Sequence, residues 1–300
     1  DTGDGDITFS LSKEKDILDE SIEYVMGYGY EFDTHAEMMS YKIADTYTTQ
    51  DYLYELLADF LHEASFFGYQ QEYLQEEIEK LEDSLKEINE QPEALERTIM
   101  PRIHDGLPDF EEDEIDDEVL KDLKSIVIVA CGTAMHAGMV GKSLIESKLR
   151  IPVIVEIASE FRYKDPIIDK DTLTIVVSQS GETIDTLEAL RLAKQKGSRV
   201  LSIVNVKGST IARESDYVLY THAGPEIAVA STKAYTVQIS AMYLLAARLG
   251  LVKGILSEDE VKEFIRRLIE AGDLIKKTIE ASNDIRCIAN HIQTAPDVFY

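Results

Sequence analysis

Five short apolar runs between residues 125 and 220 constrain the fold more than any other feature of this 300-residue sequence. Each run is apolar at nearly every position, which is typical of parallel strands that are buried on both faces. Amphipathic helix patterns separate the runs, and strands that alternate with helices predict a parallel sheet covered on both sides. We therefore expect an α/β fold: a doubly wound, flavodoxin-like sheet of five parallel strands in a three-layer α/β/α domain. The expected strands are 125–130, 152–157, 173–178, 199–204 and 217–220.

Three turns rich in small and hydroxyl residues follow expected strands, at the edge where sheets of this kind bind ligands. They are residues 131–133, 178–183 and 224–233. A helix N-terminus offers free N–H groups and a favourable dipole to an anion, and hydroxyls add donors without charge. Ser180 and Thr183 could also be ordinary helix caps. Three such turns at one edge favour a compact phosphorylated metabolite over simple capping.

The third turn leads into a helix that we expect over residues 232–249, with Ser231 as its N-cap. Lys233, in the first turn of that helix, could contact a phosphate or could equally be exposed to solvent. Cys131, at the end of the first strand, is expected to be a small packing residue rather than a reactive thiol.

Missing motifs exclude several kinds of ligand. No Gly-x-Gly-x-x-Gly follows a strand and no P-loop is present, so neither a dinucleotide nor a nucleoside triphosphate is indicated and no cofactor is expected. The two cysteines, Cys131 and Cys287, have no disulfide or metal-ligand spacing, and Cys287 with His291 is expected to be helix packing rather than a metal site. The net charge of −27 argues against a nucleic-acid partner. Without a signal-peptide pattern or an apolar run of about 18 residues, we expect a cytoplasmic protein that does not enter a membrane.

The acidity is concentrated near the N-terminus. Residues 1–90 hold 24 Asp and Glu against five Lys and no Arg. Their apolar spacing is helical, and a heptad-like seam runs through Leu74, Ile78, Leu81, Leu85 and Ile88. We expect an all-α acidic module over 1–88, to which the sequence assigns no chemistry. Connecting helices and an acidic linker are expected over 89–124, the sheet domain over 125–252, and linking helices with one further strand over 253–300.

The sheet region resembles a known family. The resemblance rests on five runs in the same order, over about residues 86–300: 128–133, 156–163, 178–183, 211–217 and 224–234. These resemble the sugar isomerase (SIS) domain, and in particular the first of the two such domains in the glutamine–fructose-6-phosphate aminotransferase family. Residues 1–85 resemble nothing that we can identify.

The resemblance implies a pocket for fructose 6-phosphate or glucosamine 6-phosphate and a homodimer. The implied phosphate contacts are Ser178, Gln179, Ser180 and Thr183, and the implied sugar contacts are Thr133, Val229 and Ser231. The family usually has Ser where this chain has Ala134, so one hydroxyl donor is missing at that edge of the pocket.

The family transfers an amide nitrogen from glutamine to the ketose carbonyl and then isomerises the ketose to an aldose. That chemistry uses a cysteine nucleophile in a glutaminase, a Schiff-base lysine, a glutamate and a histidine. Residues 1–90 show no glutaminase-like stretch, and residues 296–300 resemble the first strand of the second SIS domain. We therefore expect a sugar-phosphate half-site without catalytic residues or a metal in this chain. The alternatives are a non-catalytic sugar-phosphate sensor, or an interaction function in which the N-terminal module binds an unidentified protein partner.

Overall fold

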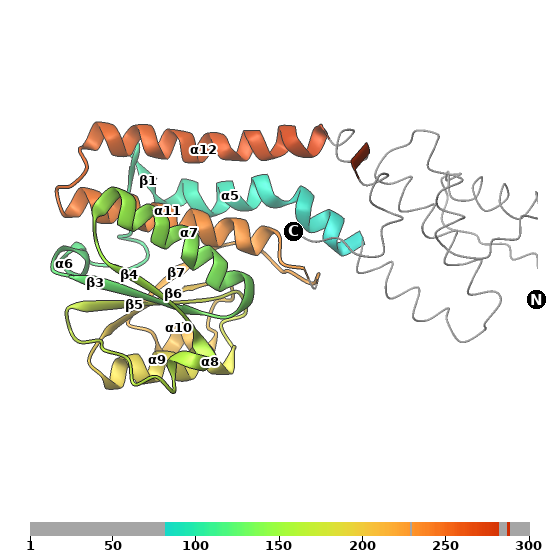
Figure 1. The fold of residues 1–300 in the computed structure, drawn as a ribbon. Coiled ribbons are helices and arrows are strands. Elements are labelled where there is room, and N and C mark those ends of the chain that lie inside the picture. The colour runs from blue at the N-terminus through green and yellow to red at the C-terminus, as the bar shows by residue number, and fades with distance from the viewer. Residues whose placement is uncertain (1–81, 229, 282–286, 289–300) are drawn as a thin grey trace, which may run out of the picture. The chain divides into compact units, whose positions relative to one another are not determined.

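A computed structural model describes residues 82–228, 230–281 and 287–288 (Figure 1). The chain divides into two compact units, residues 86–276 and residues 1–85 with 277–300. The expected acidic module and the further strand therefore lie almost wholly outside the described residues. The expected division at residues 88, 124 and 252 stays a prediction.

The unit of residues 86–276 is built on a five-stranded parallel sheet in the order β4-β3-β5-β6-β7. This is the flavodoxin-like order that the sequence predicts, and the fold class is confirmed. The strands are β3 (Ser125–Ala130), β4 (Val153–Ile157), β5 (Thr172–Ser178), β6 (Arg199–Val204) and β7 (Tyr217–Tyr220).

Alternate residues of each strand belong to two separate hydrophobic clusters, one on each face of the sheet. In β3, Ile126 and Ile128 pack on one face, while Val127 and Val129 pack on the other. Burial on both faces explains why the strands read as continuous apolar runs. Figure 1 shows the two helical layers. One contains α7 (Gly132–Leu149) and α11 (Lys233–Val252), and the other contains α8 (Ala158–Phe161), α9 (Ile184–Gln195) and α10 (Thr210–Glu214).

Helix α11 is the core helix of the first layer. Among the described residues it alone is long and apolar enough to cross a membrane, and 61% of its most apolar window is buried inside the unit. It packs against α7 and α5 (Gln91–Ile99), and the contact with α7 is close. A Cβ on Gly141 of α7 would lie 3.0 Å from Met242 of α11.

Two further helices flank this layer. The helix α6 (Asp117–Lys121) begins at Asp116, whose carboxylate accepts a hydrogen bond from the Glu118 N–H. The helix α12 (Glu258–Glu280) begins with a reciprocal capping box between Ser257 and Glu260.

The segment that we expect to be a linker also contains regular structure. After the 3-10 turn η1 (Met100–Arg102), strands β1 (Ile103–His104) and β2 (Leu107–Pro108) pair in an antiparallel hairpin. Asp105 and Gly106 connect them with φ of 52° and 80°, the backbone that a type I′ Asp-Gly turn requires.

Candidate functional site

The turn after β5 is folded around its own hydroxyl groups. Ser178, the last residue of β5, is buried, and its Oγ accepts a hydrogen bond from the Gly181 N–H at 3.1 Å. The same oxygen lies 3.1 Å from Thr183 Oγ1, and Ser180 Oγ accepts from the Glu182 N–H at 3.2 Å. All four predicted phosphate contacts belong to one compact loop, residues 178–183, and hydroxyl groups of three of them hold it together.

Neighbouring backbone fixes this loop from the β6 side. Gln179 O accepts from the Asn205 N–H at 3.1 Å, and Gly181 O accepts from the Ile211 N–H at 3.0 Å. Gly181 has φ of +66°, and a Cβ there would lie 2.0 Å from Ser209 Oγ, so this position requires glycine.

Glu182 adds a side-chain anchor between the loop and α10. Its carboxylate accepts from the Thr210 N–H at 2.7 Å. This hydrogen bond lowers the pKa of Glu182, because it stabilises the ionised carboxylate. The loop is thus held in place before any ligand arrives.

The turn after β3 lies beside this loop. Ala130 of β3 pairs with Val177 of β5, so residues 131–133 and 178–183 are neighbours at the carboxyl edge. The chain goes from β3 to β4 on one side and returns to β5 on the other, which makes this the topological switch point. Thr133 is exposed in the first turn of α7, whereas Ala134 is buried against the core.

The helix N-termini at this edge differ in what occupies them. Among the described residues, no side chain caps α7 or α9. The first turn of α9 does contain Asp185, whose carboxylate lies 3.4 Å from the guanidinium of Arg162. The uncapped N–H groups at both helices leave room for an anion.

The third turn, between β7 and α11, corrects the prediction that Ser231 is an N-cap. Thr232, not Ser231, is the N-cap residue, and it makes no side-chain capping bond. The carboxylate of Glu226 caps the helix instead, since it accepts from the Thr232 and Ala234 N–H groups at 3.1 Å each. Ser231 Oγ donates to the other oxygen of Glu226 at 3.2 Å. Val229 lies outside the described residues.

Lys233 is neither exposed nor placed as a phosphate partner. Its side chain is 2% exposed, and its Nζ lies 2.6 Å from Glu90 Oε2. This ammonium lowers the pKa of Glu90. The sequence could not indicate this pair, because the partners are 143 positions apart.

An open cavity of about 680 Å³ lies at the carboxyl ends of β5, β6 and β7. It contacts the predicted site only at Gln179, and three basic side chains line it: Arg97, Lys207 and His222. Burial, and then the charge of Arg102, lower the pKa of His222. Asn205 also lines the cavity and organises its wall, because its side chain bonds Gly224 O at 2.7 Å and the Ala223 N–H at 2.8 Å. In the sequence, the only signal for the role of Asn205 is its position directly after an expected strand.

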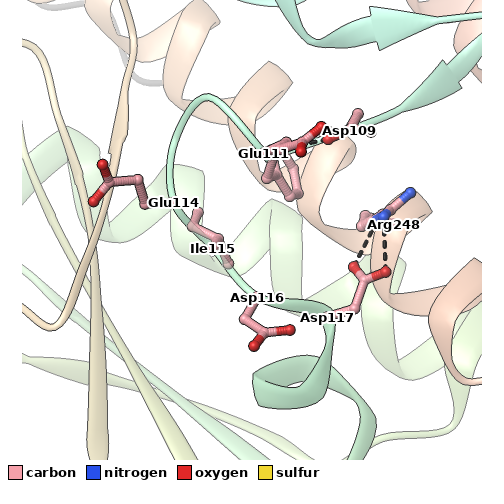
Figure 2. Close-up of a pocket in the computed structure, with 8 residues that line it drawn as sticks. Asp109, Glu111, Glu114, Ile115, Asp116, Asp117 and Arg248 are labelled. Carbon is pink, nitrogen blue, oxygen red and sulfur yellow. Dashed lines mark hydrogen bonds and ion pairs between the residues drawn. The ribbon is translucent and has the colours of Figure 1, made fainter.

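A second cavity of about 400 Å³ is acidic (Figure 2). Its one basic residue, Arg248, already forms a bidentate pair with Asp117, at 2.7 and 2.8 Å. Figure 2 shows the carboxylate of Glu114 turned away from that pair. The remaining carboxylates would repel a phosphate, so this cavity does not fit a sugar phosphate. Within the described residues, no group of three or more His, Cys, Asp or Glu side chains is placed to hold a metal ion.

The sequence and the fold are similar to those of known proteins. A sequence profile of the SIS domain matches residues 119–248. The glutamine–fructose-6-phosphate aminotransferase (isomerizing) of Clostridium tetani is 52% identical over 218 residues, which are 72% of this chain and 36% of that protein. The Streptomyces coelicolor enzyme of the same name is 50% identical over 209 residues, 69% of this chain and 34% of that protein. The chain thus spans about a third of the length of these curated relatives.

A solved structure is also similar. The C-terminal domain of glucosamine-fructose-6-phosphate aminotransferase from Francisella tularensis superposes with a TM-score of 0.68 at 38% identity. The match covers 71% of this chain and 60% of that domain.

Proposed function

Because residues 119–248 form an SIS domain, we propose that this chain binds a phosphorylated sugar, fructose 6-phosphate or glucosamine 6-phosphate, at the switch point between β3 and β5. One observation carries the proposal. The uncapped N-terminus of α9 adjoins a loop of hydroxyl residues that neighbouring backbone already holds in place. A helix N-terminus of this kind stabilises a phosphate without a positive side chain.

The phosphate is assigned to the loop of residues 178–183, through Ser178, Gln179, Ser180 and Thr183. The sugar is assigned to Thr133, Val229 and Ser231. Ala134 offers no hydroxyl, and its burial means that the α7 edge contributes through Thr133 and backbone N–H groups.

The name of these relatives describes a glutamine-dependent aminotransferase that acts on fructose 6-phosphate. For this chain we propose binding rather than catalysis, as one half of a site in amino sugar biosynthesis. We further propose a cytoplasmic homodimer. A non-catalytic sugar-phosphate sensor is the second candidate, because residues 86–276 form one compact unit around the site. An interaction function of residues 1–88 is compatible with either.

Ligand-induced thermal stabilisation tests the proposal. Fructose 6-phosphate or glucosamine 6-phosphate should raise the unfolding temperature of the wild-type chain, because a ligand that binds only the folded state stabilises it. Ser178→Ala combined with Ser180→Ala should abolish this shift. Ser147→Ala is the matched control, because its hydroxyl is exposed on α7 and, among the described residues, bonds only Leu144 O.

Two outcomes contradict the proposal. An equal ligand-induced shift in the double variant would remove the phosphate assignment. Formation of glucosamine 6-phosphate from fructose 6-phosphate and glutamine by this chain alone would contradict the binding-only role.

A further inference from the structure

We propose that Glu87 is a positioning residue for the sugar side of the site: its carboxylate sets the backbone at Ile227 and Ala228, in the turn that leads to Ser231. The inference rests on the proposed sugar-phosphate site and adds to it a residue from outside the SIS domain. Glu87 lies 32 positions before the first residue of the SIS match, in a helical segment that ends at residue 89.

The geometry is that of a carboxylate shared by two backbone donors. Glu87 is 3% exposed, and its Oε1 accepts from the N–H of Ile227 and, at 3.2 Å, from the N–H of Ala228. Two successive N–H groups that converge on one oxygen define the local backbone direction. Hydrogen bonds to an ionised acceptor are stronger than neutral ones, so this anchor is well suited to hold a turn.

The turn has little apolar packing of its own to hold it there. The Ile227 side chain is 70% exposed, and Pro225 is exposed as well. Asn205 bonds the start of the turn at Gly224 O, and Glu226 fixes the end that enters α11. Glu87 therefore holds the middle of the turn, at Ile227 and Ala228.

Nearby contacts keep Glu87 in register with the turn. Glu90 pairs with the buried Lys233, and Gln91 Oε1 accepts from Thr236 Oγ1 at 2.6 Å. Residues 87–91 therefore contact the turn and the first turn of α11 at three successive points. These three contacts together position residues 87–91 against the turn.

The test separates the sugar side of the site from the phosphate side. Calorimetry would measure the dissociation constants of fructose 6-phosphate and of inorganic phosphate for the full chain. Glu87→Ala should weaken fructose 6-phosphate binding by about tenfold, because the N–H groups of Ile227 and Ala228 both lose their acceptor. Inorganic phosphate binding should stay unchanged, because it uses the loop of residues 178–183. Glu87→Gln should restore most of the affinity, since its carbonyl oxygen can still accept both N–H groups.

Two further variants complete the design. Glu87→Asp keeps the charge but shortens the side chain by one methylene, so its carboxylate should no longer reach the two N–H groups. It should therefore weaken fructose 6-phosphate binding as Glu87→Ala does. This variant replaces Glu87→Ala if the alanine variant does not fold. Glu93→Ala is the matched control on α5, because the Glu93 side chain is 75% exposed and pairs, within the part of the chain that is described, only with Arg97. Hydrogen exchange at Ile227 and Ala228 should accelerate in Glu87→Asp and not in Glu93→Ala.

The outcomes for the inference and for the proposed function are distinct. No binding of fructose 6-phosphate by the wild type would overturn the proposed function, and unchanged exchange at the two N–H groups would overturn the anchor by itself. Wild-type binding with equal affinity in Glu87→Asp would overturn only the inference. An equal loss for fructose 6-phosphate and inorganic phosphate would also overturn it, because a general structural defect does not distinguish the two ligands.

Discussion

Gly181→Ala tests whether the loop of residues 178–183 is shaped by its close contact with Ser209, the N-cap residue of α10. Gly181 has φ of +66°, and the left-handed region costs an alanine about 1–2 kcal/mol. The new Cβ would lie 2.0 Å from Ser209 Oγ and 2.5 Å from Ser209 Cβ. Overpacking of this kind adds about 1–3 kcal/mol. We therefore expect the free energy of unfolding to fall by about 2–5 kcal/mol in total.

Two comparisons separate the backbone contribution from the steric one. Gly197 also has a positive φ, +87°, but a Cβ there meets nothing within 4 Å, so Gly197→Ala should show only the backbone cost. Ser209→Gly removes both overlapping atoms of the neighbour. Ser209 Oγ has no partner among the described residues and does not cap α10. Ser209→Gly alone should therefore lower the free energy of unfolding by only about a few tenths of a kcal/mol.

Urea denaturation would measure these effects, with an unchanged slope showing that the unfolded state is unaffected. Gly181→Ala combined with Ser209→Gly should recover the steric part of the loss. Ser209→Ala should recover less, because it keeps the Cβ that lies 2.5 Å away. A Gly181→Ala loss no larger than that of Gly197→Ala, or no recovery with Ser209→Gly, would refute the reasoning.

Two other predictions concern charged groups near the site. Asp113→Ala should lower the free energy of unfolding by about 3–5 kcal/mol, because it leaves the buried Arg102 guanidinium without its bidentate partner at 2.6 and 2.7 Å. In the same urea assay Glu118→Ala should cost under about 1 kcal/mol, since that side chain is 69% exposed, and equal losses would contradict the prediction. The Thr210 N–H lowers the pKa of Glu182, so its stabilising effect is present above the ordinary value of 4.5 and is lost as the pH falls through the folded-state pKa. The difference in unfolding temperature between the wild type and Glu182→Gln should thus shrink on acidification, and a constant difference down to about pH 3 would contradict this.

The sheet could be predicted from the sequence because its determinants are local. Continuous apolar runs report burial on both faces, and the observed bounds of β6 and β7 agree with the predicted ones. The rules for crossover connections then leave few strand orders. The hairpin at Asp105-Gly106 was not predicted, although Asp-Gly is a strong hairpin signal. Its strands are only two residues long, so they show no alternating pattern.

Side-chain contacts between distant segments could not be predicted in the same way. A serine before a helix is a good N-cap candidate, yet Ser231 is displaced from that role by Glu226, five positions earlier. Lys233 looks like an exposed first-turn lysine until Glu90 is brought against it. In both cases a carboxylate outside the helix takes the donor: Glu226 comes from the same turn, and Glu90 comes from 143 positions away.

The same competition indicates where an anionic ligand can bind. At α10 and α11 the first-turn N–H groups already bond the carboxylates of Glu182 and Glu226. A phosphate at α11 would have to displace Glu226 and would meet its negative charge, whereas α9 presents uncapped N–H groups and three hydroxyls. The turn before α11 therefore differs from the turns before α7 and α9, whose N-termini no described side chain caps. Of those two, the turn before α9 has the three hydroxyls, which supports a phosphate at the loop of residues 178–183. The turn beside α11 is left to the sugar, because Glu226 already occupies the N–H groups there.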